Sequence, residues 1–283
     1  MSKVWFITGA SRGFGVLMAK DALARGDSVV ATARNPQSVT DALGEHPNLL
    51  ALRLDVTQEA AAVLAARAAV DRFGRIDVLV NNAGYGLLGA VEEASDAEVR
   101  AQYDTNVFGL LNVTRAVLPY MRKQGSGHVM NMSSVGGYTA HAGWGVYGST
   151  KFAVEGISEA MAEEVRPLGI HVTVVEPGYF RTEFLEGNSL VSTGAQMADY
   201  AGTVGAMRTF AASVSLKQPG DPRKLSQAIL KLADAARPPV RLMLGSDTVR
   251  MVREKNHFVE QELGEWIALS LSTDHDDVLK QAA

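Results

Sequence analysis

Short apolar runs alternate with longer helix-like segments over the first two-thirds of the chain, and this alternation limits the possible folds more than any other feature. Each run is rich in Val, Ile or Leu, as is typical of strands buried on both faces of a sheet. The runs are Val4–Thr8, Ser28–Ala33, Leu49–Leu54, Ile76–Val80, His128–Met132 and Ile170–Glu176. Strands that alternate with helices predict a parallel sheet covered by helices on both faces.

The segments between the apolar runs have helical composition and recognisable ends. They are Phe14–Arg25, Gln58–Phe73, Ser95–Gln124 and Gly145–Pro167. Ser95 and Glu98 have the spacing of a capping box, in which each side chain bonds the backbone N–H of the other. Pro167 and Gly169 end the last of these helices. The predicted fold class is therefore α/β, with a doubly wound parallel sheet.

The chain changes character after Glu176. Residues 187–220 are rich in Ser, Thr, Gly, Ala and Met and carry few charges, which predicts a mobile, partly helical lid over a substrate site. A helix capped by Asp221, a strand over Val240–Leu244 and a terminal helix over Asp247–Ser270 are expected to follow. Although a length of 283 residues allows two domains, we expect a single domain over residues 1–283 with the lid inside it.

The composition excludes several classes of protein. A net charge of −4 argues against a dedicated nucleic-acid binder, which usually carries a basic face. The absence of Cys excludes disulfide scaffolds, thiolate zinc sites and cysteine nucleophiles, and no pair of His has helical metal-ligand spacing, so we expect no metal. No apolar stretch reaches the roughly 18 residues of a membrane span or has the form of a signal peptide, which predicts a cytoplasmic protein.

A glycine-rich loop follows the first predicted strand and reads Thr8-Gly9-Ala10-Ser11-Arg12-Gly13-Phe14-Gly15. Glycines let a backbone approach a pyrophosphate closely, and the following helix offers free N–H groups and partial positive charge. The loop therefore predicts a dinucleotide site, although a tight turn without a ligand has the same local pattern. Residues Gly9 to Gly13 also match the Gly-x-Ser-x-Gly nucleophile elbow of α/β-hydrolases, with Ser11 as nucleophile. That alternative places the elbow on the first strand and leaves Gly15 unexplained.

The end of the second predicted strand bears on the choice of cofactor. NAD sites usually carry an acidic residue there, which binds the ribose 2′-hydroxyl, whereas an Arg accommodates the 2′-phosphate of NADP. No acid is present at this position, and Arg34 follows the strand directly. Arg12 in the glycine loop is a second guanidinium that could clamp a phosphate. These residues predict a preference for NADP(H).

A second group of candidate residues is formed by Tyr147, Lys151 and Ser134. Tyr147 and Lys151 are four residues apart, so on a helix they share a face and can meet one ligand. A phenol with a pKa of about 10 needs nearby positive charge to exchange protons near neutrality. Lys151 supplies such a charge, and Ser134, at the end of the fifth predicted strand, could polarise a substrate carbonyl. Ser133 adjoins Ser134, but the spacing of thirteen residues to Tyr147 favours Ser134.

Taken together, the motifs resemble those of the short-chain dehydrogenase/reductase family, closely over about residues 3–186. They occur in family order: Thr8-x3-Arg12-Gly13-x-Gly15, Asn81-Asn82-Ala83-Gly84, Asn106, Ser134, Tyr147-x3-Lys151 and Pro177-Gly178-x3-Thr182. The resemblance implies a Rossmann fold and an oxidoreductase that transfers a hydride between NADP(H) and a carbonyl or secondary alcohol. It also implies a homodimer or homotetramer formed through the helices at 95–124 and 145–167.

The resemblance implies catalytic roles for four residues. Tyr147 would be the general acid in reduction and the base in oxidation. Lys151 would hold the nicotinamide ribose and lower the pKa of Tyr147, and Ser134 would bind the substrate oxygen. Asn106 would anchor a water that connects Lys151 to solvent. A cofactor-sensing protein on the same fold is the alternative, although a sensor has no need of the Ser134, Tyr147 and Lys151 trio.

The resemblance also assigns the binding sites. Asn82, Ala83 and Gly84 would line the adenosine side, Asp55 would touch the adenine, and Pro177, Gly178 and Thr182 would fix the carboxamide. The full expected cofactor site is Gly9, Ser11, Arg12, Gly13, Phe14, Gly15, Arg34, Asp55, Val56, Asn82, Ala83, Gly84, Tyr147, Lys151, Pro177, Gly178 and Thr182. The expected substrate site is Ser134, Tyr138, His141, Trp144, Tyr179 and Phe184. Similarity to the hydroxysteroid and retinol dehydrogenase branch, together with these aromatic residues, favours an apolar small-molecule ketone or aldehyde.

Overall fold

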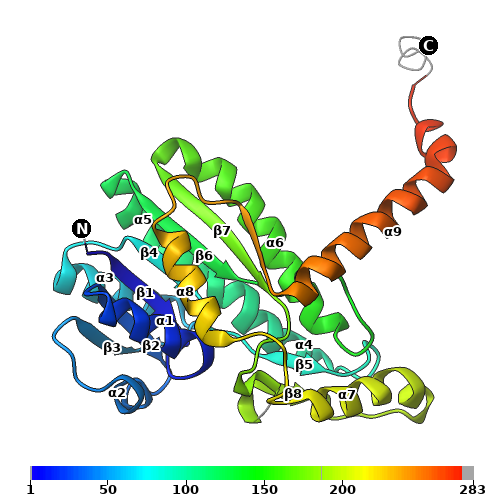
Figure 1. The fold of residues 1–283 in the computed structure, drawn as a ribbon, viewed down its shortest axis with the longest axis horizontal. Coiled ribbons are helices and arrows are strands. Elements are labelled where there is room, and N and C mark those ends of the chain that lie inside the picture. The colour runs from blue at the N-terminus through cyan, green and yellow to red at the C-terminus, as the bar shows by residue number, and fades with distance from the viewer. Residues whose placement is uncertain (1, 186, 276–283) are drawn as a thin grey trace.

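The computed structural model describes residues 2–185 and 187–275, and a parallel sheet of seven strands forms its centre (Figure 1). The strand order is β3-β2-β1-β4-β6-β7-β9. The bounds of these strands are β1 Val4–Thr8, β2 Ser28–Ala33, β3 Leu49–Arg53, β4 Val78–Asn81, β6 Gly127–Met132, β7 Ile170–Pro177 and β9 Arg241–Leu244. The predicted α/β class with a doubly wound parallel sheet is confirmed, and the whole sheet belongs to one domain.

The sheet is wound in opposite directions from β1. On one side the chain continues to β2 and β3, and on the other side it returns as β4, β6, β7 and β9. Trp5 of β1 is accordingly paired with Val29 of β2 and with Val78 of β4, both in parallel register. Ligands of open α/β folds bind where the winding reverses, outside the carboxyl ends of the strands. In this chain that point is the carboxyl edge of β1 and β4.

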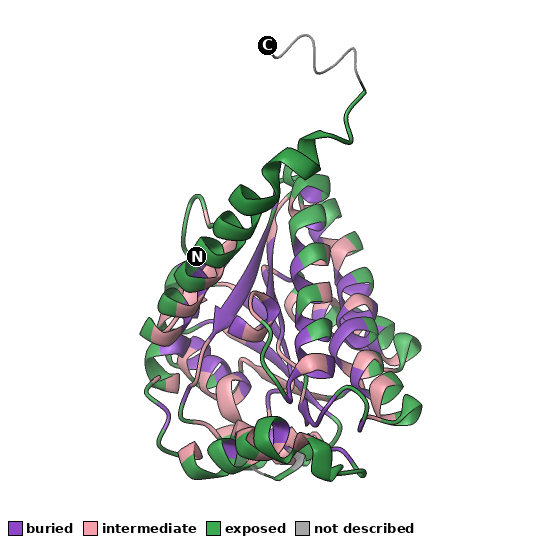
Figure 2. Ribbon diagram, turned by 90° about the vertical axis from the view of Figure 1, so that its right-hand side faces the viewer, coloured by how far each residue is buried: buried purple, intermediate pink, exposed green. Residues whose placement is uncertain are grey.

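Two layers of helices bury both faces of the sheet, as Figure 2 shows by the buried strands between them. The first layer is α1 Gly13–Ala24, α2 Gln37–Leu43 and α8 Pro222–Ala233, and the second is α3 Glu59–Phe73, α5 Gly109–Gln124 and α6 Gly145–Val165. Side chains alternate between faces along a strand. In β1, Trp5 and Ile7 therefore pack on the first layer and Phe6 on the second, all fully buried.

The helix expected over 95–124 is divided into three parts in the structure. α4 Asp96–Tyr103 begins with the predicted capping box, since Glu98 N donates to Ser95 Oγ and Ser95 N donates to Glu98 Oε2. A π-helical turn follows over Asp104–Phe108, and α5 then continues the helix. Such turns are frequent at functional sites, and this one contains Asn106.

The predicted lid segment is attached to the rest of the molecule by a strand pairing and by contacts with Glu93, among others. Its strand β8 Leu190–Ser192 pairs with β5 Gly86–Leu88 in a small sheet that the sequence patterns did not predict. The buried Glu93 carboxylate accepts a hydrogen bond from Met197 N and forms an ion pair with Arg208 of α7 Ala206–Val214. The segment is therefore held beside the carboxyl edge of the sheet.

The chain ends in α9 Ser246–Leu271, which follows β9. None of the helices within residues 2–185 and 187–275 is long and apolar enough to cross a membrane.

Candidate active site

The glycine loop connects β1 to α1 and leaves the first turn of that helix without a side-chain cap. Arg12 is the extended N-cap residue, and its guanidinium, which carries only donors, cannot cap the N–H groups of the helix. Gly9 and Gly13 have φ values of +64° and +55°, which other residues rarely adopt. The N–H groups of the first turn and the positive end of the helix dipole are therefore available to an anion.

The glycine loop is fixed to the end of β4 by hydrogen bonds. Thr8 Oγ1 accepts hydrogen bonds from Asn82 N at 2.9 Å and from Ala83 N at 3.0 Å. In return, Asn82 Nδ2 donates to the carbonyl oxygens of Thr8 and Gly9, both at 3.0 Å. Asn82 thus connects the two strands at the point where the winding of the sheet reverses.

Gly15 lies beneath this loop, where a side chain has no room. A Cβ atom there would overlap the carbonyl oxygen of Gly9 and lie 2.8 Å from Asn82 Nδ2. We expect Gly15→Ala to lower the free energy of unfolding by about 1–3 kcal/mol, as overpacking of a tight site does. Gly156→Ala is the control, because Gly156 lies on the exposed surface of α6 and a Cβ atom there would meet no other atom within 4 Å. Urea denaturation should show that only Gly15→Ala is destabilising.

A long cleft of about 970 Å³ extends from the glycine loop across the carboxyl edge of the sheet. Most of the predicted cofactor residues line it: Gly9, Ser11, Arg12, Gly13, Phe14, Arg34, Asp55, Val56, Asn82, Ala83, Gly84 and Thr182. The structure does not bring Gly15 to the surface of the cleft, because it is buried under the loop. The cleft is large enough for an extended ligand, since ligand pockets usually measure about 300–1,000 Å³.

Two free cations lie at the outer end of the cleft. Arg12 and Arg34 are both exposed and both line it. Within residues 2–185 and 187–275, neither guanidinium forms an ion pair. Asp55 lies nearby but is engaged locally, since its Oδ1 accepts hydrogen bonds from Thr57 N and Thr57 Oγ1. The guanidiniums are therefore available to an anionic ligand.

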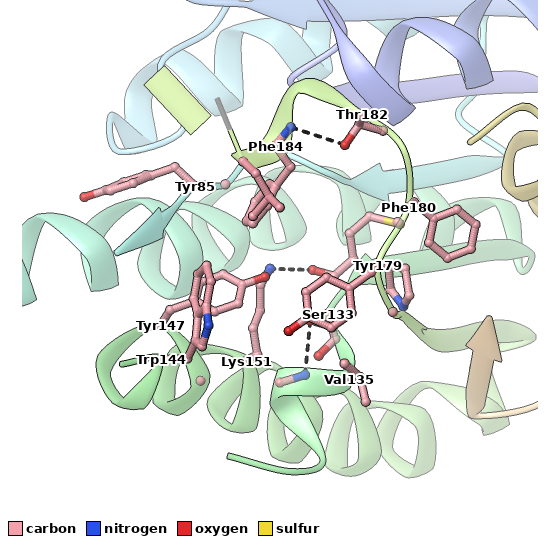
Figure 3. Close-up of a pocket in the computed structure, with 18 of the residues that line it drawn as sticks. Tyr85, Ser133, Val135, Trp144, Tyr147, Lys151, Tyr179, Phe180, Thr182 and Phe184 are labelled. Atoms are coloured by element: carbon pink, nitrogen blue, oxygen red, sulfur yellow. Dashed lines mark hydrogen bonds between the residues drawn. The ribbon is translucent and has the colours of Figure 1, made fainter. Parts of the chain in front are cut away.

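An inner pocket of about 170 Å³ adjoins this cleft (Figure 3). The predicted residues that line it are Ser134, His141, Trp144, Tyr147, Lys151, Pro177, Gly178, Tyr179 and Phe184. Phe14, Asn82, Gly84 and Thr182 line both spaces. Aromatic rings pack around Tyr147, whose ring centroid is 5.7 Å from that of Trp144 and 5.9 Å from that of Phe184. A ligand in the cleft would therefore meet a second molecule in an apolar pocket.

Helix α6 places Tyr147 and Lys151 in the wall of the inner pocket. Lys151 Nζ donates a hydrogen bond to Met132 O at 2.8 Å and lies 5.7 Å from the centre of the Tyr147 ring. Burial raises the pKa of Tyr147 to about 12, against the effect of a hydrogen bond with Ser134, and burial lowers the pKa of Lys151 to about 8. Burial therefore favours the neutral, proton-bearing form of Tyr147.

Asn106 does not line the inner pocket but braces the residues that do. Asn106 Nδ2 donates to Tyr85 O and Thr150 Oγ1, and Asn106 Oδ1 accepts from Tyr85 N. Thr150 in turn donates to Tyr147 O at 2.7 Å. A Cβ atom on Gly84 would lie 3.1 Å from Asn106 Oδ1 and 3.8 Å from Lys151 Nζ, so the glycine leaves space for both side chains.

The two adjacent serines have different surroundings. Ser134 Oγ accepts a hydrogen bond from Gly136 N at 3.1 Å and interacts with Tyr147, as the spacing predicted. Ser133 Oγ lies near Glu155 Oε1, since a Cβ atom on Gly137 would be 2.6 Å from the first and 2.9 Å from the second, and Ser133 Oγ has no hydrogen-bond partner within the described residues. The structure therefore brings Ser134, and not Ser133, together with Tyr147.

Tyr138 is the one predicted substrate residue that the structure places away from the inner pocket. Its hydroxyl donates to Asn256 Oδ1 on α9 at 2.6 Å, and the Arg241 guanidinium lies 5.5 Å from the centre of its ring. It follows the short 3₁₀ turn Val135–Gly137, which directs it to the far side of this segment. Sequence spacing alone could not reveal this direction.

A partly buried cluster of charges near Lys151 was not predicted from the sequence. Arg241 forms ion pairs with Glu155 at 2.5 Å, with Glu176 at 3.0 Å and with Glu159 at 2.8 Å. Burial raises the pKa of both Glu155 and Glu176. The available signal was the position of Glu155, four residues after Lys151 on the same helix.

Gln218 was also missed, and it lines the inner pocket at 2% exposure. Neither its Nε2 nor its Oε1 finds a hydrogen-bond partner in the part of the chain that the structure describes. The Arg181 guanidinium holds its backbone by donating to Gln218 O at 3.2 Å. No motif marks this residue, because a long-range pairing of residues 180 and 220 brings it to the pocket.

Comparisons with known proteins agree with this geometry. The family model for short chain dehydrogenases matches residues 3–190. Oxidoreductase BOA17 of Botryotinia fuckeliana is 38% identical over 275 residues, which cover 96% of this chain and 100% of that protein. A 3-ketodihydrosphingosine reductase of Bacteroides thetaiotaomicron is 39% identical over 244 residues, covering 86% of this chain and 88% of that protein.

Solved structures extend the comparison to three dimensions. A short-chain dehydrogenase from Streptomyces avermitilis has a TM-score of 0.90 and 42% identity, covering 97% of this chain and 100% of that one. ElxO, with NADP bound, has a TM-score of 0.73 and 26% identity, covering 88% and 100%. A 3-ketoacyl-(acyl-carrier-protein) reductase from Brucella melitensis, complexed with NADH, has a TM-score of 0.72 and 27% identity, covering 86% and 96%.

Proposed function

Because the chain belongs to the short-chain dehydrogenase/reductase family and is an oxidoreductase of that type, we propose that it transfers a hydride between NADP(H) and an apolar carbonyl compound or secondary alcohol. The observation that carries the proposal is the meeting of Tyr147, Ser134 and Lys151 where the long cleft adjoins an aromatic pocket. With family membership established, Ser11 belongs to a cofactor loop, and the hydrolase alternative is not retained.

The residues of the cleft fit a dinucleotide phosphate. The uncapped first turn of α1 would bind the pyrophosphate, and Arg12 and Arg34 would bind a 2′-phosphate. Pro177, Gly178 and Thr182 would hold the carboxamide of the nicotinamide beside Tyr147. Solved relatives contain either NADP or NADH. Within residues 2–185 and 187–275 neither arginine forms an ion pair, so both are free to bind a 2′-phosphate, which supports NADP(H) over NAD(H).

In the proposed mechanism the bound cofactor supplies the hydride, and this chain handles the oxygen and its proton. The Ser134 and Tyr147 hydroxyls would bind the carbonyl oxygen in the inner pocket. As the carbonyl carbon gains the hydride, Tyr147 would give its proton to the oxygen, and the Lys151 ammonium would stabilise the phenolate that remains. In the oxidation direction the phenolate would take the alcohol proton, and Asn106 would keep α6 in place throughout.

The lining of the inner pocket favours apolar substrates. Trp144, Tyr179 and Phe184 supply the apolar surface, and Gln218 offers a polar group, unpaired within the described residues, that a substrate or cofactor carboxamide could bind. The similarity to a 3-ketodihydrosphingosine reductase supports a ketone with a long apolar part. Residues 187–220 would act as the lid that excludes water from this pocket.

The proposal includes a homodimer or homotetramer that forms through α4, α5 and α6. Two large side chains support it: Phe108, in the π-helical turn between α4 and α5, is 53% exposed, and Phe152 of α6 is 44% exposed. Burial of such surface is a common driving force for association.

The proposed function is tested by following NADPH oxidation with a panel of ketones and aldehydes of increasing apolar length, with NADH in parallel. We expect turnover with NADPH that improves with apolar length, and a weaker reaction with NADH. Tight NADPH binding without turnover of any carbonyl compound would instead support the cofactor-sensing alternative.

A further inference from the structure

Helix α9 leaves the body of the molecule after its first three turns (Figures 1 and 2). In residues 246–256, here called the root, Thr248 and Val252 are buried and Asn256 accepts the hydrogen bond from Tyr138. In residues 257–271, here called the overhang, every residue is exposed. The overhang is about 22 Å long at 1.5 Å per residue.

An apolar stripe runs along the overhang on the same face that packs on the body in the root. At 100° per residue, Val259, Leu263 and Ile267 fall on the face of Val252. Their exposed fractions are 47%, 46% and 42%, and Trp266 beside them is 61% exposed. The face that anchors α9 therefore continues past the edge of the body with none of the described residues beneath it. Contiguous apolar surface of this kind marks an interaction site.

The root and the overhang carry opposite charges. The root contains Arg250, Arg253 and Lys255 against Asp247 and Glu254, a net charge of +1, whereas the overhang contains Glu260, Glu262 and Glu265 and neither Lys nor Arg, a net charge of −3. Arg250 forms an ion pair with Glu254 of the same helix. The other two cations and the three glutamates of the overhang form no ion pair within residues 2–185 and 187–275.

We propose that a second copy of this chain covers the overhang, with its α9 running antiparallel so that each acidic overhang lies along the basic root of the other copy. When two identical helices pack antiparallel along their apolar stripes, each flank of the stripe on one helix lies against the same flank on the other. Lys255 and Glu262 lie on one flank, and Arg253 and Glu260 lie on the other. The first pair is centred between residues 258 and 259 and the second between residues 256 and 257, about 3 Å apart along the helix. A single register therefore brings the long side chains of both pairs within reach of each other.

Apolar contacts satisfy the same register. Val249 of the root is 40% exposed and shares the face of Ile267, and this pair is centred on residue 258, between the centres of the two charged pairs. The arrangement is isologous, because each copy gives its overhang and receives the other's, as a two-fold dimer requires. An anionic lipid surface fits less well, since the overhang has three glutamates and neither Lys nor Arg.

The proposal is tested by the mass of the full-length protein in solution, measured by light scattering and sedimentation equilibrium. Replacing two stripe residues, Leu263→Gln with Ile267→Gln, should halve the mass. This holds for a dimer formed through α9 alone, and for a tetramer that also associates through α4, α5 and α6. The control is Gln261→Ala with Ala268→Gln, two exposed residues on the opposite face of the overhang, and it should keep the wild-type mass. Circular dichroism confirms that both variants are folded.

A charge exchange tests the register. Lys255→Glu should weaken association, and adding Glu262→Lys in the same chain should restore it, because the exchanged pair is again complementary across the two copies. A monomeric wild-type protein, an unchanged mass after the stripe substitutions, or no rescue by the second charge change would overturn the proposal. So would flotation with phosphatidylcholine vesicles that the stripe substitutions abolish, since that result assigns the stripe to a lipid surface.

Discussion

Replacing Tyr147 by phenylalanine is expected to lower kcat for carbonyl reduction by about 10²- to 10⁴-fold, the usual contribution of a positioned general acid. The substitution removes one hydroxyl and leaves the ring between Trp144 and Phe184. The aromatic packing of the pocket and the long cleft should therefore persist. NADPH affinity, measured by fluorescence titration, should change less than threefold. Steady-state kinetics with the best ketone of the panel measures the loss.

Tyr179→Phe is the matched control for this substitution. Tyr179 lines the same pocket, and burial raises its pKa as it does that of Tyr147, but it is not paired with Ser134 and Lys151. Its replacement should change kcat by less than tenfold. If Tyr147→Phe retained near-wild-type turnover, or if both variants lost the same activity, Tyr147 would not be the proton donor. The pH profile of kcat for reduction adds a second measurement. Because a phenol with a pKa of about 12 is protonated throughout the neutral range, kcat should not fall there through loss of the Tyr147 proton.

The fold and the centre of the site could be predicted because both depend on residues that lie close together in the sequence. The runs at 4–8 and 28–33 became β1 and β2 with the predicted bounds, and glycines that need a positive φ mark the loop after β1. Tyr147 and Lys151 share a helix, so their spacing fixed their geometry. Ser134 could be assigned because it follows closely after β6, and β6 pairs with β4, the strand that Asn82 follows.

Features that depend on distant parts of the chain could not be predicted in this way. The small sheet of β5 and β8 requires residues 86 and 190 to meet, and Gln218 reaches the pocket through the bridge between residues 180 and 220. Arg241 compensates Glu155 and Glu176 from a strand at the far edge of the sheet. The side of the chain on which Tyr138 emerges was decided by a single 3₁₀ turn.

The apolar residues of α9 show a different limit. Their periodicity predicts a helix in either case, but it does not tell whether the apolar face lies on the body or extends beyond it. The structure makes this distinction, because burial ends at Val252 while the stripe continues to Ile267. The same pattern thus contributes to the fold in the root and to the proposed interface in the overhang.

Replacing Arg34 by aspartate is expected to weaken NADPH binding by about 10- to 100-fold and to leave NADH binding unchanged or improved. A charge-assisted hydrogen bond contributes roughly 1.5–3 kcal/mol, and each 1.4 kcal/mol is tenfold in affinity. Aspartate also repels the 2′-phosphate, whereas it can accept a hydrogen bond from the 2′-hydroxyl of NADH. Because Arg34 is exposed and unpaired within residues 2–185 and 187–275, its loss should not affect folding.

Arg67→Asp is the control for the change in net charge. Arg67 is an exposed residue of α3 that does not line the cleft, so its replacement should leave both affinities within twofold of the wild type. The effects of Arg12→Ala and Arg34→Asp on NADPH affinity should not be additive, since both guanidiniums would hold the same phosphate. Calorimetric titration with both cofactors measures the ratio of the two affinities. An unchanged ratio in the Arg34→Asp protein would mean that this arginine does not contact the 2′-phosphate, and the preference for NADP(H) would then have to come from Arg12 alone or be absent.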